Sequence, residues 1–253
     1  SQLQLHHGST IFVLGEHGVG KSYLCQYFLD ELSSENCLIM NAFCFEQKNS
    51  AALYVWSSLL LQLQKQCKAH NIELPAQFLE TLRIIFPMLD TFNSIEELPM
   101  DVTASYNYRA VRNSVLRLLS QISEQIPLVI FIDNLQHMDD MSTEWLSSLI
   151  RSDNDNILIL GTCSLHPRTE TDRFINTMVT RRNVSKLTLN RFTEEDIRSY
   201  VASRHLEHLV SDNDITHIFH ECKGNPFYLT LLLDHLQDSD PTDTAHPRAM
   251  DIL

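Results

Sequence analysis

The chain has 253 residues, enough for one large α/β domain or for a domain with a small appendage. Its hydrophobic fraction of 43% and charged fraction of 20% are ordinary for a globular protein, and no apolar run approaches the roughly 18 residues of a membrane span. The 19 Lys and Arg against 32 Asp and Glu give a net charge of −13, which disfavours direct nucleic-acid binding by this segment.

The first residues and the cysteines both favour a cytoplasmic location. Residues 1–8 (SQLQLHHG) contain no charged segment and no apolar segment, so we expect no signal peptide. The six cysteines are scattered through apolar stretches without a C-x-x-C pair. We therefore expect buried thiols in a reducing compartment, rather than a disulfide framework or a metal site.

Residues 15–22 (GEHGVGKS) match G-x-x-x-x-G-K-S, the phosphate-binding loop of P-loop nucleotidases. The apolar, β-branched run TIFVL at residues 10–14 predicts a buried strand before it. Leu24, Phe28 and Leu32 recur at helical spacing after it and predict a helix with these residues on one face. A strand before the loop and a helix after it is the context that this motif requires.

The chemistry of the loop predicts nucleotide binding. Glycines let the backbone turn tightly and aim successive N–H groups into one concave nest, and the helix adds the positive end of its dipole. Lys21 supplies a point charge for the β- and γ-phosphates, and the Ser22 hydroxyl is a ligand for Mg²⁺. The residues expected to hold ATP or ADP in this loop are Gly15, Gly18, Val19, Gly20, Lys21, Ser22 and Tyr23.

The next stretch predicts one strand and two long helices. Residues 37–41 (CLIMN) are typical of a strand, and residues 51–67 of a helix with Leu53, Trp56, Leu60 and Leu63 packed inward. Prolines break residues 68–102 into short pieces, and residues 108–126 are again amphipathic. We interpret residues 68–126 as a helical insertion.

Residues 128–133 (LVIFID) form a continuous apolar run that ends in an acid. This pattern predicts a buried parallel strand with Asp133 at its carboxyl end, where open α/β sheets bind their ligands. Asp133 would hold hydrated Mg²⁺ together with Ser22. The alternative is a strand whose acid only caps the following turn.

Two more strands and a helical segment complete the pattern. Residues 141–150 predict a helix capped by Ser142, and residues 157–162 a buried strand that ends in Thr162. The Thr162 hydroxyl would sense the γ-phosphate or position water, or would merely finish the strand. Residues 186–189 predict the fifth strand, and residues 193–196 (TEED) a capping box that opens the helical segment.

The helical segment carries a break, and the chain ends in a polar tail. At residues 223–226 (KGNP) the glycine ends one helix and the proline starts the next. We divide the chain into an α/β domain at residues 1–190, a lid at residues 191–237 and a linker or frayed tail at residues 238–253.

The order of these motifs resembles the STAND branch of signal-transduction ATPases within the wider AAA+ group. Four stretches carry the resemblance: GEHGVGKS at residues 15–22, FIDNLQHMD at residues 131–139, LGTCS at residues 160–164 and KGNPF at residues 223–227. The fourth stretch, similar to the family's G-N-P-F, is the most specific. The resemblance covers most of the chain, from about residue 8 to residue 236.

The resemblance implies a fold, cofactors and partners. The fold is α/β: a P-loop NTPase with a five-stranded parallel sheet flanked by helices, the Thr162 strand between the P-loop and Asp133 strands, and a small C-terminal helical lid subdomain. The cofactors are ATP or ADP with Mg²⁺, with Pro226 near the base. The implied partners are other domains of a longer chain and further copies in a nucleotide-dependent oligomer, without nucleic acid or membrane.

Two departures from the family's pattern concern hydrolysis. The second acid, which polarises water in the family, is Asn134 here, and Ser164 stands where the family has a sensor arginine. An amide orients water through its carbonyl but accepts no proton, so we expect an ATPase with slow hydrolysis, unless Asp139 or Asp140 replaces the base. Arginines before the fifth strand are arginine-finger candidates, although a solvated surface is the simpler interpretation: Arg173, Arg181 and Arg182.

One function fits these patterns best, and three alternatives are open. The leading hypothesis is an ATP-binding regulatory switch of a larger signalling or transcription-regulatory protein. An initiator-like AAA+ ATPase that loads onto DNA would need a lid arginine and a basic domain, and the charge of −13 disfavours it. Asn134 and Ser164 also suit a scaffold that keeps its nucleotide intact. A small-molecule phosphotransferase would need a substrate pocket that no motif marks.

Overall fold

The computed structural model describes residues 9–32, 36–46, 52–75, 108–152, 154–164, 169–206 and 210–238. Of the expected insertion at residues 68–126, residues 76–107 lie outside this part, as do residues 1–8 and 239–253. Contacts divide the chain into two compact units, Ser1–Val13 with Leu24–Leu187 and Leu14–Tyr23 with Thr188–Leu253. The domain boundary expected after residue 190 stays a prediction.

A five-stranded sheet is the framework of the first unit, and its strand order is β2-β3-β4-β1-β5. The strands are β1 (Ser9–Gly15), β2 (Leu38–Phe43), β3 (Leu128–Asp133), β4 (Ile157–Ser164) and β5 (Val184–Thr188). β2 pairs parallel with β3, and β3 with β4. The expected fold class is confirmed, including the position of the Thr162 strand between the P-loop and Asp133 strands.

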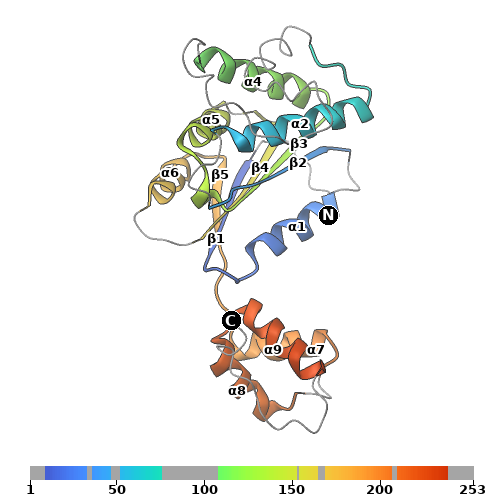
Figure 1. The fold of residues 1–253 in the computed structure, drawn as a ribbon, viewed down its shortest axis with the longest axis vertical. Helices are drawn as coiled ribbons and strands as arrows, with labels where there is room; N and C mark the ends of the chain where they lie inside the picture. The colour runs from blue at the N-terminus through green and yellow to red at the C-terminus, as the bar shows by residue number, and fades with distance from the viewer. Residues whose placement is uncertain are drawn as a thin grey trace. The chain divides into compact units, whose positions relative to one another are not determined.

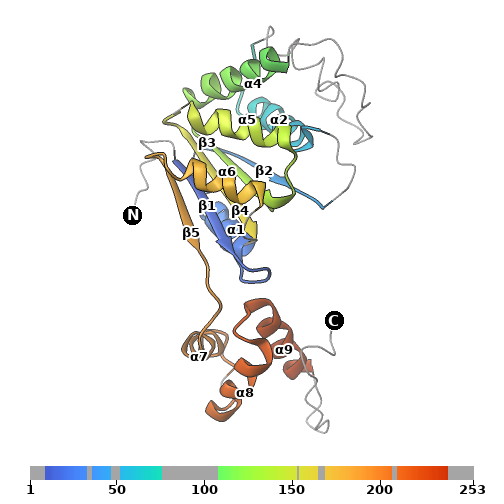
Figure 2. The same ribbon diagram turned by 90° about the vertical axis from the view of Figure 1, so that its left-hand side faces the viewer.

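The burial of the strands explains their apolar sequences. Every residue of β3 and of β4 is buried, as expected for central parallel strands covered on both faces. Helices cover both faces of the sheet (Figures 1 and 2). The helices are α1 (Lys21–Leu32), α2 (Tyr54–Ala69), α4 (Tyr108–Ser123), α5 (Asp140–Arg151) and α6 (Glu170–Met178).

Two local predictions were wrong in part, and one helix was not predicted. In α1, Leu32 is buried as predicted, but Leu24 is exposed and Phe28 is only half-buried, whereas Cys25 and Leu29 are the other buried apolar residues. The cap of α5 is Asp139 rather than Ser142, since the Asp139 carboxylate accepts from the Ser142 backbone N–H at 2.8 Å. Helix α6 was not predicted at all.

α2 closes the open edge of β2. The Gln62 side chain accepts from the Asn41 N–H at 2.9 Å and donates to the Asn41 carbonyl at 2.6 Å. One turn later, Gln66 makes the same pair of bonds to Ile39. Two side-chain amides thus replace a neighbouring strand and satisfy backbone groups that an edge strand otherwise exposes.

The second unit joins the loop after β1 to three helices, α7 (Glu194–Ser203), α8 (Asp212–Cys222) and α9 (Pro226–Asp238). The expected capping box is confirmed, because Thr193 and Asp196 bond reciprocally at the start of α7. The expected break is confirmed too, with α8 ending at Cys222 and α9 starting at Pro226. Apolar residues of all three helices form one cluster, with Ile197, Leu229 and Cys222 at its most buried positions.

Candidate functional site

The loop between β1 and α1 depends on glycines at two positions. Gly18 has φ +80° and Gly20 has φ +94°. Residues other than glycine rarely adopt such positive φ values. α1 begins directly afterwards at Lys21, so the positive end of the helix dipole lies at the loop. The backbone therefore has the local form of a phosphate-binding nest.

Lys21 lies over this loop. Its side chain is buried, and its Nζ donates to the carbonyl oxygens of Gly15 at 3.1 Å and Glu16 at 2.8 Å. Ser22 and Tyr23 follow in the first turn of α1, and Tyr23 is 78% exposed. A buried ammonium held at a concave loop is suited to receive phosphate oxygens.

The turn between α8 and α9 contacts the same loop. Asn225, only 5% exposed, donates from Nδ2 to the His17 carbonyl at 2.9 Å. The Phe227 backbone N–H donates to the Gly18 carbonyl at 3.1 Å. The expected contact residue, Pro226, lies between these two donors. The sequence marks Asn225 only as part of the KGNPF stretch and does not predict its contact with the loop.

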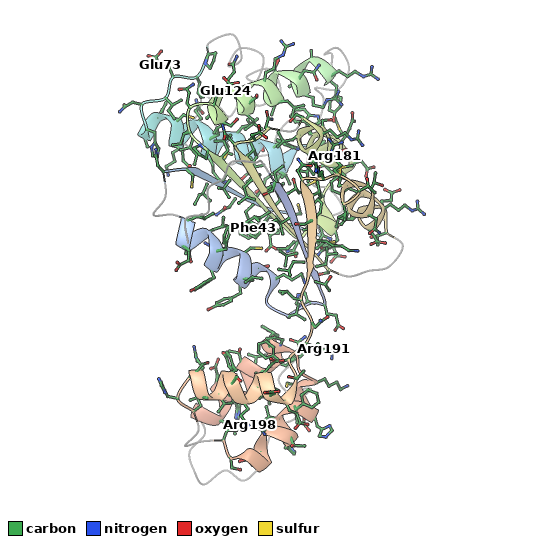
Figure 3. The ribbon with its side chains drawn as sticks, turned by 180° about the vertical axis from the view of Figure 1, so that it is seen from behind. Phe43, Glu73, Glu124, Arg181, Arg191 and Arg198 are labelled. Carbon is green, nitrogen blue, oxygen red and sulfur yellow. The ribbon has the colours of Figure 1, made fainter. Side chains whose placement is uncertain are left out.

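Arg191 makes a second link to the loop. It precedes α7, and its guanidinium donates to the Glu16 carboxylate, with Nε at 2.9 Å (Figure 3). The same guanidinium donates to the Lys223 carbonyl at 3.3 Å, where α8 ends. Arg191 therefore joins the loop to the segment before α7 and to the α8–α9 turn within the second unit.

Asp133 and Thr162 form the polar end of the central strands in the first unit. Both side chains are buried, and the Thr162 hydroxyl donates to the Asp133 carboxylate. The Asn134 backbone N–H donates to Thr162 Oγ1 at 2.9 Å. Next to Thr162, Gly161 has no space for a β-carbon, which would lie 2.6 Å from Leu135. Tight packing thus holds the hydroxyl on the carboxylate.

Asn134 is held in the left-handed region, with φ +60°. Its side-chain oxygen accepts from Gln136 Nε2 at 3.4 Å, and Gln136 Oε1 accepts from the Ser164 N–H at 3.1 Å. Gln136 therefore connects Asn134 to Ser164, the two positions that depart from the family's pattern. Sequence reasoning missed this bridge, because nothing in a single sequence marks a contact across 28 residues.

The two acids expected as possible replacement bases, Asp139 and Asp140, lie at the start of α5. Asp139 uses one carboxylate oxygen for the Ser142 N–H and the other for the Ser142 hydroxyl at 2.6 Å. Asp140 is the first residue of the helix. Asp139 is thus engaged in capping.

The sequence-predicted residues fall into two sets. Asp133, Asn134 and Thr162 meet in the first unit, and the loop residues with Pro226 belong to the second. Asp133, in the first unit, and Ser22, in the second, each carry an oxygen of the kind that Mg²⁺ takes as a ligand. Within the described ranges, no group of three or more His, Cys, Asp or Glu could hold a metal ion by itself.

The three arginines that the sequence offers as arginine-finger candidates lie on or after α6. Arg173 on α6 and Arg182 are exposed, and Arg181 is half-buried (Figure 3).

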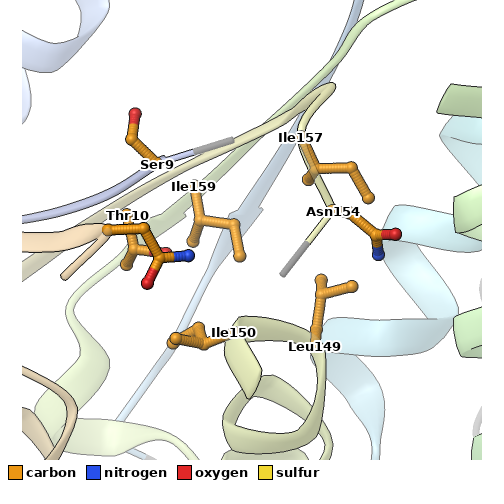
Figure 4. A pocket seen from close by; sticks show the side chains of 8 residues that line it. Ser9, Thr10, Leu149, Ile150, Asn154, Ile157 and Ile159 are labelled. Carbon is orange, nitrogen blue, oxygen red and sulfur yellow. The ribbon is translucent and has the colours of Figure 1, made fainter. Parts of the chain in front are cut away.

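A small hollow at the amino ends of β1 and β4, beside Asn154, has room for about one water molecule (Figure 4). The phosphate-binding loop follows the other end of β1, so this hollow is not a nucleotide site. In the part of the chain that the structure describes, no helix is both long and apolar enough to cross a membrane.

Comparisons with known proteins identify the fold. The solved structures that resemble the chain include a Signal Transduction ATPase with Numerous Domains from Pyrococcus horikoshii, which carries a tetratricopeptide repeat sensor (TM-score 0.54, 15% identity, 95% of this chain and 29% of that one). They also include the Aeropyrum pernix ORC2 protein in ADPNP–ADP complexes (TM-score 0.50, 14% identity, 92% of this chain and 58% of that one). At these identities the likeness shows the fold alone.

The chain spans less than two thirds of either solved structure. No curated protein matches it. The family model described as AAA ATPase domain matches residues 2–160, which is more than half of the chain. These residues contain the loop, β3 with Asp133 and the first half of β4, so the chain belongs to the AAA ATPase domain family.

Proposed function

We propose that this chain is a nucleotide-dependent regulatory switch that binds ATP or ADP with Mg²⁺. The observation that carries the proposal is the joining of the phosphate-binding loop to the lid. Asn225, Phe227 and Arg191 all bond to loop residues, within one compact unit. A conformational change of the loop on binding phosphate would therefore be passed through these hydrogen bonds to the helices α7 to α9.

In the proposed mechanism each group has one task. Loop N–H groups and Lys21 bind the phosphates, and Pro226 lies beside the loop to contact the base. Ser22 and Asp133 would hold Mg²⁺, which when bound neutralises phosphate charge. Thr162 keeps the Asp133 carboxylate oriented through its hydrogen bond. Asn134 can orient a water molecule but accepts no proton from it, so the bound triphosphate persists as a signal.

The switch would act within a larger assembly. One similar solved structure is a signal-transduction ATPase of which this chain covers 29%. We infer that the lid passes the nucleotide state to further domains of the same full-length chain or to further copies, in a cytoplasmic protein. A second candidate function, initiator-like DNA loading, is supported by the similarity to ORC2 and opposed by the net charge of −13.

The test is a nucleotide titration of the Lys21→Ala variant. Removal of the buried ammonium should weaken ATP and ADP binding at least tenfold, because a charge-assisted bond to phosphate is lost. The Lys65→Ala variant, which removes an exposed lysine of α2, serves as a matched control and should bind like the wild type. Wild-type affinity in Lys21→Ala would refute the site.

A further inference from the structure

The α8–α9 turn contacts two successive peptide groups of the phosphate-binding loop. Asn225 Nδ2 donates to the His17 carbonyl, and the Phe227 N–H donates to the Gly18 carbonyl. Both donors and both acceptors belong to the second unit. The loop is thus held from the carbonyl side of its peptide groups.

Because of the geometry of the peptide group, this contact also sets the direction of the neighbouring N–H groups of the loop. In a planar trans peptide, the C=O and the following N–H point in opposite directions. A bond that fixes the His17 carbonyl therefore also fixes the Gly18 N–H, and a bond to the Gly18 carbonyl fixes the Val19 N–H. Successive N–H groups of such a loop are its phosphate-binding groups.

Asn225 is built into this position. It is buried, and its Oδ1 accepts from the Phe227 N–H at 3.0 Å, so both ends of the amide are used. A β-carbon at Gly18 would lie 2.7 Å from that oxygen and 3.0 Å from Phe227 Cβ. The glycine of the loop and the asparagine of the lid therefore fit one another closely.

We propose that Asn225 is a positioning residue for the phosphate-binding loop, whose side-chain amide orients the Gly18 and Val19 N–H groups toward bound phosphate. The inference rests on the proposed nucleotide binding and deepens it. Linkage makes the effect reciprocal, since a phosphate that favours this loop conformation also strengthens the bond to the lid turn. The position of the lid turn thereby depends on bound phosphate, although Asn225 does not contact the phosphate itself.

The experiment compares Asn225→Asp with Asn190→Asp in titrations with ADP and with adenosine. Asn225→Asp keeps the acceptor for Phe227 but loses the donor to His17, whereas Asn190→Asp adds the same charge at an exposed position of the same unit. We expect ADP affinity to fall roughly tenfold in Asn225→Asp alone, with adenosine binding unchanged. Unchanged ADP affinity, or an equal loss for adenosine, would overturn the proposal.

A second measurement covers the case in which Asn225→Asp does not fold. In the wild type, ADP should slow hydrogen exchange of the Phe227 amide together with the loop amides. Protection of the loop alone would overturn the proposal. If the wild type binds no ADP, the proposed function itself fails; if Lys21→Ala loses binding while Asn225→Asp keeps it, only the role of Asn225 fails.

Discussion

In the function that we propose, Asn134 is the residue that decides whether the bound nucleotide is kept or hydrolysed. Its backbone is fixed by bonds to Thr162 and Asp133, and its φ of +60° suits asparagine and aspartate better than other side chains. An aspartate can therefore take the same place without rebuilding the turn. The difference between the two residues lies in their ability to accept a proton from water.

We expect Asn134→Asp to raise ATP turnover at least tenfold, because general-base groups contribute factors of about 10² to 10⁴. The measurement is steady-state phosphate release, with Asn190→Asp as a control for the added charge. A wild type that already turns over fast, with a rate unchanged in Asn134→Asp, would contradict the idea of a slow switch.

Gly224 shows how tightly the lid turn is packed. Its φ is +69°, and a β-carbon would lie 2.1 Å from the Phe192 carbonyl oxygen, which no side-chain rotation can relieve. We expect Gly224→Ala to cost about 2 to 4 kcal/mol of stability, from backbone strain and overlap together. Gly20→Ala, which has strain but nothing within 4 Å, should cost only about 1 to 2 kcal/mol. Thermal unfolding of both variants checks the difference, and equal losses would contradict it.

At the scale of elements, α2 and β2 depend on each other. Gln62 and Gln66 occupy backbone groups that would otherwise remain unpaired at the sheet edge. Their replacement by leucine should cost about 1 to 3 kcal/mol for each site and should promote association through the exposed edge. Urea unfolding and light scattering of Gln62→Leu and Gln66→Leu test this, with Gln64→Leu on the same helix as the control. Unchanged stability and scattering would show that the edge needs no such cover.

The sequence alone was enough to predict those helices and strands that have a strong periodicity or clear boundaries. The buried strand at residues 128–133 was predicted with its exact bounds. Five consecutive apolar residues followed by one acid are typical of a short buried strand and are too few for a helix. Helix α6 was missed because its nine residues, ETDRFINTM, are mostly polar and bury only Ile175 and Met178. Its start is marked by Thr169, whose hydroxyl accepts from the Asp172 N–H.

The site was predictable where one motif contains it and not where distant segments meet. Gly18, Gly20 and Lys21 follow from the loop motif alone. The Asn225 bond to His17 joins residues 208 positions apart, and the Arg191 bond to Glu16 joins residues 175 apart. Such contacts arise from the packing of whole helices, which a single sequence does not encode as a local pattern.

At the scale of the whole molecule, α1, α2 and the segment after β2 each bury a thiol, and two of these thiols feel the charge of Asp133. Burial, and then the charges of Asp139 and Asp133, raises the pKa of the Cys44 thiol from 9.0 to about 12. Burial and then Asp133 raises the pKa of Cys25 to about 11, and burial raises that of Cys67 to about 11. In the folded protein these thiols stay protonated and unreactive at neutral pH, as expected for cysteines that serve as small core residues.

This arrangement predicts a stability that falls in alkaline solution. In the unfolded chain a thiol loses its proton near pH 9, whereas the folded state retains it until its raised pKa is reached. The stabilisation is therefore complete below about pH 9 and is lost as the pH rises from there toward 11 to 12, by about 1.4 kcal/mol per pH unit for each thiol. Urea unfolding at pH 8, 9 and 10 should show this decline in the wild type and a smaller one in Cys44→Ala. The buried Ser57 of α2 provides the comparison, since it does not titrate in this range and Ser57→Ala should leave the decline as steep as in the wild type. If Cys44→Ala also declines as steeply, burial and the charges of Asp139 and Asp133 do not together raise the pKa of the Cys44 thiol in the folded protein.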